Sequence, residues 1–173
     1  MVIRKAEKAE FDDVIAFYHE LIDSMRDAEF RPKWEKDIYP TRQFIYDSIE
    51  KEEMHVAVAD DGIISAMVVN HDSADGYEKA PWKMQADKNQ IAVIHILAVS
   101  TRHQRRGAAK EMVAYAIDKS RKNGMKAIRL DVLAENKPAH ILYASMGFIN
   151  IGTIKLYYED TGLTEFALYE LAF

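Results

Sequence analysis

Apolar residues recur along this chain with two periods, one typical of helices and one typical of strands. A period near 3.6 residues predicts amphipathic helices, and short alternating or continuous apolar runs predict strands. Helices are expected at about residues 11–25, 41–50, 107–122 and 137–146, and strands at residues 2–4, 55–59, 63–70, 91–99, 127–133, 148–158 and 164–171. This order of elements predicts an α/β domain in which helices cover a mixed sheet.

The stretch from Ile91 to Gly124 organises the rest of the chain. Its first part, residues 91–99, is an apolar run long enough for a buried central strand. A short basic turn follows at residues 100–106, and Gly107 then opens a segment with the apolar stripe of an amphipathic helix. The stretch therefore predicts a strand, a basic turn and a helix that begins at a glycine.

Such a turn has the properties of an anion site. The first N–H groups of a helix lack intrahelical partners, and the helix dipole is positive at that end. The small residues Gly107, Ala108 and Ala109 would let a phosphate approach the backbone, with Arg105 and Arg106 adding positive charge. The same residues could instead ease packing of the helix on the sheet and form a solvated face. The pattern alone leaves both interpretations open, and it is neither GxxxxGK[ST] nor GxGxxG.

Two motifs resemble those of the GNAT superfamily of acyl-CoA-dependent N-acyltransferases. The turn Gln104–Ala109, QRRGAA, resembles the family pattern Q/R-x-x-G-x-G/A. The segment Asn136–Phe148 is similar to the pattern N-x-x-A-x-x-x-Y-x-x-x-G-F, and the two motifs are separated by one helix and one strand, as in that family. Departures from the commonest pattern, such as Ala109 in place of a second glycine, remove no group that the family requires.

The resemblance implies a fold and a cofactor. The fold would be a mixed, mostly antiparallel sheet with a splayed parallel pair of central strands, covered by about four helices, and residues 1–173 would form a single N-acetyltransferase domain. Acetyl-CoA, with no metal, would enter the gap between the two central strands. The residues implied to hold it are Leu97, Ala98 and Val99 along the pantetheine, Gln104, Arg105, Arg106, Gly107, Ala108 and Ala109 at the pyrophosphate, and Asn136, Ala139 and Tyr143 on the following helix.

The implied reaction is direct attack of an amine on a thioester within a ternary complex. Tyr143 could protonate the departing thiolate, and His95, which interrupts an apolar strand, is a candidate general base. Each has a structural alternative, because Tyr143 could be a core aromatic and His95 a core histidine with a satisfied ring. Proton removal could also run through water and the backbone, without a dedicated base.

Aromatic residues in two irregular segments are candidates for the wall of an acceptor pocket. Tyr77 and Trp82 lie in the long polar stretch 72–90, and Trp34 lies in a proline-containing stretch near residue 30. Long loops in compact domains are often functional. The alternative is that the loop folds back on itself and that Trp34 closes the edge of the core.

Composition and charge exclude several classes of function. The chain has 173 residues and no cysteine, which excludes a disulfide framework and a thiolate nucleophile. We expect a cytoplasmic protein, because the first residues lack the apolar region of a signal peptide and no apolar run has the length of a membrane span. A homodimer is compatible with the sequence but has no signal in it.

The net charge of −5 is unevenly spread. Residues 102–129 hold nine Lys and Arg against two Asp and Glu. This block could bind nucleic acid, but its single aromatic residue and the acidic chain favour a local phosphate site. The resemblance to the GNAT superfamily implies a primary-amine acceptor as partner, and we expect a small-molecule amine or amino acid or, next, a protein amine. The alternative is a non-catalytic acyl-CoA-binding module.

Overall fold

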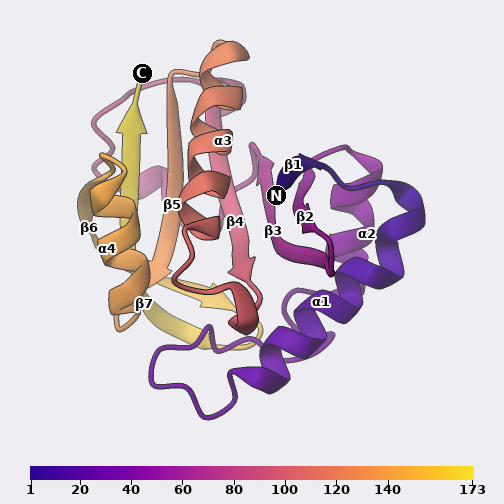
Figure 1. Ribbon diagram of the computed structural model, residues 1–173. Helices are drawn as coiled ribbons and strands as arrows, with labels where there is room; N and C mark the ends of the chain where they lie inside the picture. The colour runs from indigo at the N-terminus through magenta and orange to yellow at the C-terminus, as the bar shows by residue number, and fades with distance from the viewer.

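One seven-stranded sheet with helices on both faces forms the body of the protein (Figure 1). The computed structural model describes residues 1–173, and the strand order in the sheet is β1-β2-β3-β4-β5-β7-β6. The strands are β1 (Val2–Lys5), β2 (Met54–Ala59), β3 (Gly62–Asn70), β4 (Ile91–Val99), β5 (Ala127–Leu133), β6 (Ile149–Tyr158) and β7 (Gly162–Ala172). The helices are α1 (Phe11–Ser24), α2 (Arg42–Glu50), α3 (Ala108–Lys122) and α4 (Lys137–Ser145).

The two faces of the sheet carry separate hydrophobic clusters. Helices α1 and α2 cover one face, where Val14, Tyr18 and Ile45 pack on inward side chains of β2 and β3. Helices α3 and α4 cover the other face, where Met112 and Tyr143 belong to a second cluster with β4 and β5. The helical stripes in the sequence thus become the two sides of a three-layer domain, and none of the helices combines the length and apolar character needed to cross a membrane.

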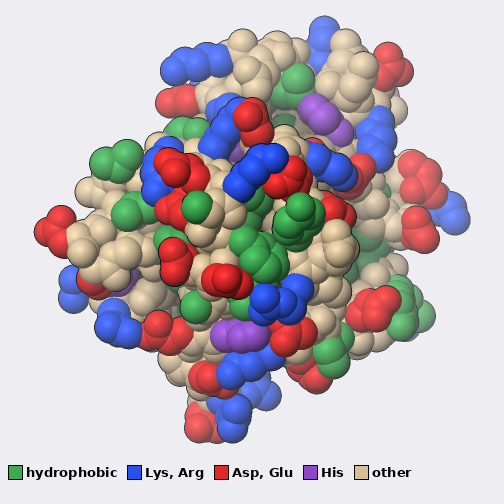
Figure 2. All heavy atoms as spheres, turned by 90° about the vertical axis from the view of Figure 1, so that its right-hand side faces the viewer, with side chains coloured by type: hydrophobic (Ala, Val, Ile, Leu, Met, Phe, Trp, Pro, Cys, Tyr) green, Lys and Arg blue, Asp and Glu red, His purple; other side chains and the backbone are tan.

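Charges of both signs cover the side of the molecule formed by β1 and α2. Figure 2 shows lysine, arginine, aspartate and glutamate side chains interspersed over this side. Lys5 pairs with Glu52 at 2.5 Å and Lys8 pairs with Glu50 at 2.6 Å, all on the surface. The first 60 residues hold fifteen Asp and Glu against nine Lys and Arg. These pairs neutralise part of that acidic excess, and it forms no single-sign patch on this side.

The sheet is antiparallel except at one place, which confirms the expected fold class. Strands β4 and β5 run parallel, but they pair only where Ile91–Val93 lie beside Ala127–Arg129. Beyond Arg129, β5 continues to pair with β7 as far as Leu133, whereas β4 stays with β3. The two central strands therefore diverge, and the backbone of β4 after Val93 has no strand partner on the side of β5.

A bulge in β4 accompanies this divergence. The β3–β4 register shifts between Ala66 and Val68, and Ile96 has a φ of 46°, which is unusual for a β-branched residue. Backbone strain of this kind costs on the order of 1–3 kcal/mol and needs support from its surroundings. The buried hydroxyl of Tyr18 supplies support, because it donates a hydrogen bond of 2.9 Å to the carbonyl of Ile96.

Replacing Tyr18 by phenylalanine tests this support. The variant Tyr18→Phe leaves the Ile96 carbonyl without its donor, so we expect the free energy of unfolding to fall by about 1–3 kcal/mol. Urea denaturation measures the change. Tyr46, on α2, is 48% exposed, and Tyr46→Phe is a matched control that should stay within about 0.5 kcal/mol of the wild type. Equal stability of the two variants would contradict the role of Tyr18.

Candidate active site

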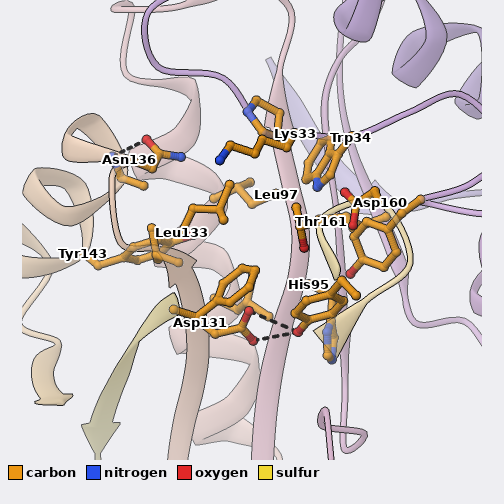
Figure 3. Close-up of a pocket in the computed structure, with 18 residues that line it drawn as sticks. Lys33, Trp34, His95, Leu97, Asp131, Leu133, Asn136, Tyr143, Asp160 and Thr161 are labelled. Atoms are coloured by element: carbon orange, nitrogen blue, oxygen red, sulfur yellow. Dashed lines mark hydrogen bonds between the residues drawn. The ribbon is translucent and has the colours of Figure 1, made fainter. Parts of the chain in front are cut away.

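A cleft opens where β4 and β5 diverge (Figure 3). It encloses a cavity of about 160 Å³ between the two strands, with walls from α4, the β6–β7 turn and the connection between α1 and α2. Three polar side chains of different elements meet there, namely His95 from β4, Asp131 from β5 and Tyr143 from α4. Leu97, Asn136 and Ala139, which the sequence analysis expected at the acyl-CoA, also line this cleft.

Only some backbone groups of β4 at the cleft make hydrogen bonds within the protein. The Ser65 hydroxyl donates to the carbonyl of Ala98 at 2.5 Å, and the side chain of Gln104 donates to the carbonyl of Val99 at 3.3 Å. Leu97, by contrast, is half-buried and faces the cleft. An extended ligand arm could therefore lie against Leu97 in the way that an added strand would.

The turn before α3 presents free donors. Gly107 is the N-cap residue, with a φ of 91°, and a Cβ built on it would meet nothing within 4 Å. The backbone amides of residues 104–107 make no hydrogen bond within the protein. The side chains of Arg105 and Arg106 are exposed and have no acidic partner, whereas Arg102 pairs with Glu20. Free amides and free guanidinium groups at a helix N-terminus fit a pyrophosphate.

Tyr143 is placed to deliver a proton into the cleft. Its ring packs against Phe148 and Tyr169, with centroid distances of 5.6 and 6.0 Å. Its hydroxyl has no hydrogen-bond partner in the protein and is not sealed from the cleft, although the residue is only 6% exposed. Burial raises the pKa of Tyr143, so the phenol stays protonated at neutral pH. The packing of the ring and a proton-donor role therefore coexist.

Asn136 caps α4 and also lines the cleft. Its side-chain oxygen accepts a hydrogen bond of 3.3 Å from the amide of Ala139 and so caps α4. Figure 3 shows the side-chain nitrogen on the side of the cleft, where it can donate to a ligand. The cap fixes the start of α4 and with it the position of Tyr143, two turns of helix onward.

Asp131 is the site residue that the sequence analysis missed. Its carboxylate accepts a hydrogen bond of 2.9 Å from the Tyr77 hydroxyl and two of 3.1 Å from the Tyr158 hydroxyl. No lysine or arginine pairs with it. Burial raises the pKa of Asp131 to about 6, against the lowering effect of the two tyrosine hydroxyls. A carboxylate that titrates near neutrality inside a cleft is a candidate general base.

The only sequence feature that could have identified Asp131 as a site residue is the alternating pattern of residues 127–133. An acidic residue at position 131 lies two positions from Arg129 and Leu133, so the three share one face of the strand. That face could have been taken as solvated. Only the divergence of β4 and β5 turns it into the floor of a cleft.

His95 lines the cleft, but its ring is held elsewhere. The Nε2 atom lies 2.9 Å from Oδ1 of Asn70 and 3.1 Å from the carbonyl of Asp72. Both neighbours are acceptors, so Nε2 carries a proton and points away from the cavity. Burial lowers the pKa of His95 to about 4. A neutral imidazole with such a low pKa is a weaker base than Asp131, so the geometry favours Asp131 for proton removal.

The three aromatic residues expected in the acceptor pocket fall into two groups. Trp34 lines the cleft beside Tyr39, with the two rings 6.5 Å apart. Tyr77 and Trp82 do not line it, and the expectation that they contact the acceptor is corrected by the structure. Both are buried beneath the β6–β7 hairpin, where Tyr77 is 3% and Trp82 is 7% exposed. The loop folds back onto the sheet because these rings complete a hydrophobic cluster.

Comparisons with known proteins agree with these motifs. A sequence model of the acetyltransferase (GNAT) family matches residues 15–148. Over 69 residues the chain is 38% identical to N-alpha-acetyltransferase 30 of Saccharomyces cerevisiae, a match that covers 40% of this chain and 39% of the yeast protein. Over 70 residues it is 36% identical to the ribosomal protein bS18-alanine N-acetyltransferase of Escherichia coli, covering 40% and 47% of the two chains. The matched part is less than half the length of these curated relatives.

The fold is similar to a solved structure across nearly the whole chain. The protein yncA of Salmonella typhimurium, whose structure contains its cofactor acetyl-CoA, has a TM-score of 0.71 to this chain at 17% identity, covering 99% of this chain and 93% of that one. The family sequence model spans both motifs, from within α1 to just past the end of α4. This chain belongs to the acetyltransferase (GNAT) family.

Proposed function

We propose that this protein transfers the acetyl group of acetyl-CoA to a primary amine by direct attack within a ternary complex. The observation that carries the proposal is the placement of Asp131 and Tyr143 in one cleft, one able to accept a proton and the other able to donate one. The names of the two curated relatives are N-alpha-acetyltransferase and ribosomal protein-alanine N-acetyltransferase. Acceptors to test are therefore protein N-termini as well as small amines and amino acids.

The residues that would hold acetyl-CoA follow from the free groups of the site. The backbone at Leu97, Ala98 and Val99 would hold the pantetheine, and the turn Gln104–Ala109 would hold the pyrophosphate. The side chain of Asn136, which lines the cleft with Leu97, would donate a hydrogen bond to the same ligand. Bound acetyl-CoA supplies an activated thioester, from which the acetyl group passes to the amine nitrogen. The chain must align the amine and manage two protons.

Asp131 and Tyr143 divide the two proton tasks. Asp131, mostly ionised at pH 7, attracts the acceptor ammonium and takes the first of the two protons that its nitrogen loses, which frees the lone pair for attack. Tyr143, kept neutral by burial, gives its hydroxyl proton on the side where the thiol leaves. The C–N bond forms as the C–S bond breaks. The second proton of the nitrogen, released when the C–N bond forms, restores the Tyr143 hydroxyl that has protonated the thiolate, and Asp131 then releases the first proton to water.

The two alternatives from the sequence analysis are less well supported. A non-catalytic acyl-CoA-binding module has no need of a free Tyr143 hydroxyl beside a buried carboxylate. A nucleic-acid surface at residues 102–129 would use all the cations of the block, yet Arg102 pairs with Glu20 and the half-buried Arg129 pairs with Glu170 at 2.9 Å, which leaves only part of the block free.

A substitution at Gly107 tests the phosphate site. In Gly107→Asp a carboxylate occupies the position of the anion at the positive end of α3, so we expect the affinity for acetyl-CoA to fall at least about tenfold. Calorimetry measures the affinity. Gly124 lies at the other end of α3, has a φ of 72° and is equally open, so Gly124→Asp is a matched control with unchanged affinity. Undiminished affinity of a folded Gly107→Asp variant for acetyl-CoA would show that the pyrophosphate does not bind at this turn.

Removal of one hydroxyl tests the proton donor. Tyr143→Phe keeps the ring packing, so we expect normal acetyl-CoA affinity and a kcat about 100-fold lower, at the lower end of general acid effects. The loss should shrink at high pH, where a thiol of pKa about 8.5 leaves unprotonated. Tyr157, 65% exposed on β6, provides the control Tyr157→Phe with unchanged kcat. Equal kcat of all three proteins, with chemistry rate-limiting, would reduce Tyr143 to a packing residue.

The pH profile of kcat/KM distinguishes the two candidate bases. A base works when deprotonated, so activity should rise with pH through about 6 if Asp131 is the base and through about 4 if His95 is. We expect Asp131→Asn to lower kcat/KM by about 10²–10⁴-fold. His95→Gln should retain the rise near pH 6. Loss of that rise in His95→Gln and its persistence in Asp131→Asn would reverse the assignment.

A further inference from the structure

The segment between β3 and β4 reaches the active-site carboxylate from beneath the cleft. Within this segment, residues 71–90, Tyr77 and Trp82 pack against each other with their ring centroids 5.1 Å apart. The Trp82 ring nitrogen donates to the carbonyl of Tyr77 at 2.6 Å. Their cluster includes Leu133 and Leu168, so the pair is built into the face of β5 and β7. Tyr77 is therefore held rigidly although it belongs to a long connection.

A buried ion pair fastens the segment to the sheet. Glu170 of β7 is 2% exposed and accepts hydrogen bonds from the amides of Lys83 and Met84 at 2.9 and 3.0 Å. Arg129 of β5 pairs with Glu170 and donates to the carbonyl of Met84 at 2.6 Å. The Arg129 guanidinium also lies 4.2 Å from the centroid of the Trp82 ring. All charges of this anchor have partners, and removal of one would leave the other buried and unpaired.

The anchor and the candidate base share one strand face. Arg129 and Asp131 are two residues apart on β5, so their side chains project from the same side. The Tyr77 hydroxyl donates to Oδ1 of Asp131 at 2.9 Å from below, and the Tyr158 hydroxyl donates to both oxygens from the wall of the cleft. Figure 3 shows the carboxylate of Asp131 with two dashed bonds toward the tyrosine on its cleft side.

We propose that Tyr77 is a positioning residue for Asp131. Through this hydrogen bond the segment 71–90 affects the acceptor site, although the segment itself does not contact the acceptor. This inference rests on the proposed function, in which Asp131 takes the proton of the amine. Tyr77 fixes the rotation of the carboxylate and donates a hydrogen bond to its ionised form. The aromatic residue that the sequence analysis expected in the pocket wall thus acts on the acceptor through a second side chain.

The titration of Asp131 has to be distinguished from that of the groups around it, among which Asp160 is a second carboxyl whose pKa is raised by burial. The titratable groups packed near it come from five elements: Tyr77 from the segment 71–90, Tyr158 and Asp160 from β6 and its turn, Tyr143 from α4, Tyr39 from the connection between α1 and α2, and His95 from β4. Arg129 is the nearest cation on its own strand. Burial raises the pKa of each of these four tyrosines, so none changes charge near pH 6. His95 has a pKa of about 4 and is already neutral there.

The sign of the effect follows from the hydrogen bond. The Tyr77 hydroxyl stabilises the ionised carboxylate, so its removal raises the pKa of Asp131 further above its ordinary value. In Tyr77→Phe we expect the rise of kcat/KM to move to higher pH by about one unit, with unchanged affinity for acetyl-CoA. A role in core packing alone would lower stability and leave the pH of that rise in place.

The matched control is Leu156→Ala, which opens the same cluster but removes no hydrogen bond that holds Tyr77 or Asp131. Both variants are compared with the wild type by thermal denaturation, by calorimetry with acetyl-CoA and by kcat/KM from pH 5 to 9 with a primary amine that the wild type acetylates. We expect the melting temperature to fall in both and the pH of the rise to shift only in Tyr77→Phe. An unshifted rise in a folded Tyr77→Phe variant would overturn the proposal.

A measurement on the wild type needs neither a folded variant nor an acceptor. Carbon-13 NMR follows the carboxyl carbon of Asp131 and the phenolic carbon of Tyr77 as the pH changes. We expect both signals to move together with a midpoint near pH 6, because the hydroxyl senses the charge of its acceptor. A Tyr77 signal that stays constant through the Asp131 titration would overturn the coupling. Failure to acetylate any amine, with the coupled titration present, would instead count against the proposed function alone.

Discussion

The divergence of β4 and β5 is the constraint on which the rest of the structure depends. The two parallel strands share hydrogen bonds only at Ile91–Val93 and Ala127–Arg129, after which each follows its own antiparallel neighbour. A sheet broken in this way exposes backbone groups that would ordinarily be paired, and such groups are stable only if water or a ligand can satisfy them. The bulge at Ile96, supported by Tyr18, lies in the same part of β4. The cleft and its unpaired strand edge thus arise from one feature.

The surroundings of each ionisable group in the cleft determine its protonation state at neutral pH. Burial keeps Tyr143 protonated and His95 neutral, while Asp131 is held near the point where it changes charge. A proton donor and a proton acceptor can therefore coexist at neutral pH in a space of about 160 Å³. The hydroxyls of Tyr77 and Tyr158 limit how far burial raises the pKa of Asp131. The segment 71–90, held by the ion pair of Arg129 and Glu170, is accordingly part of the chemistry.

Most of the fold could be predicted from the sequence, because the local signals agree with the tertiary structure. The helix predicted at about residues 41–50 is α2, capped by Thr41, and β4 and β5 have the predicted bounds. The two motifs place Gly107 and Tyr143, since each depends on residues close together in the chain. Asp131, by contrast, becomes a site residue only through the divergence of two strands and the approach of Tyr77, 54 positions away. Sequence periodicity carries no information about such pairings. For the same reason Tyr77 and Trp82 were expected to line the acceptor pocket, whereas they are buried beneath the β6–β7 hairpin.

A crystal structure of the protein with coenzyme A tests the central claim most directly. The account predicts that the pantetheine arm lies along Leu97 in the gap between β4 and β5, with the pyrophosphate on the free amides of residues 104–109. The sulfur should then lie within hydrogen-bonding distance of the Tyr143 hydroxyl, and the Asp131 carboxylate should face the same space from β5. Coenzyme A bound outside this gap, or a sulfur remote from both Tyr143 and Asp131, would contradict the account.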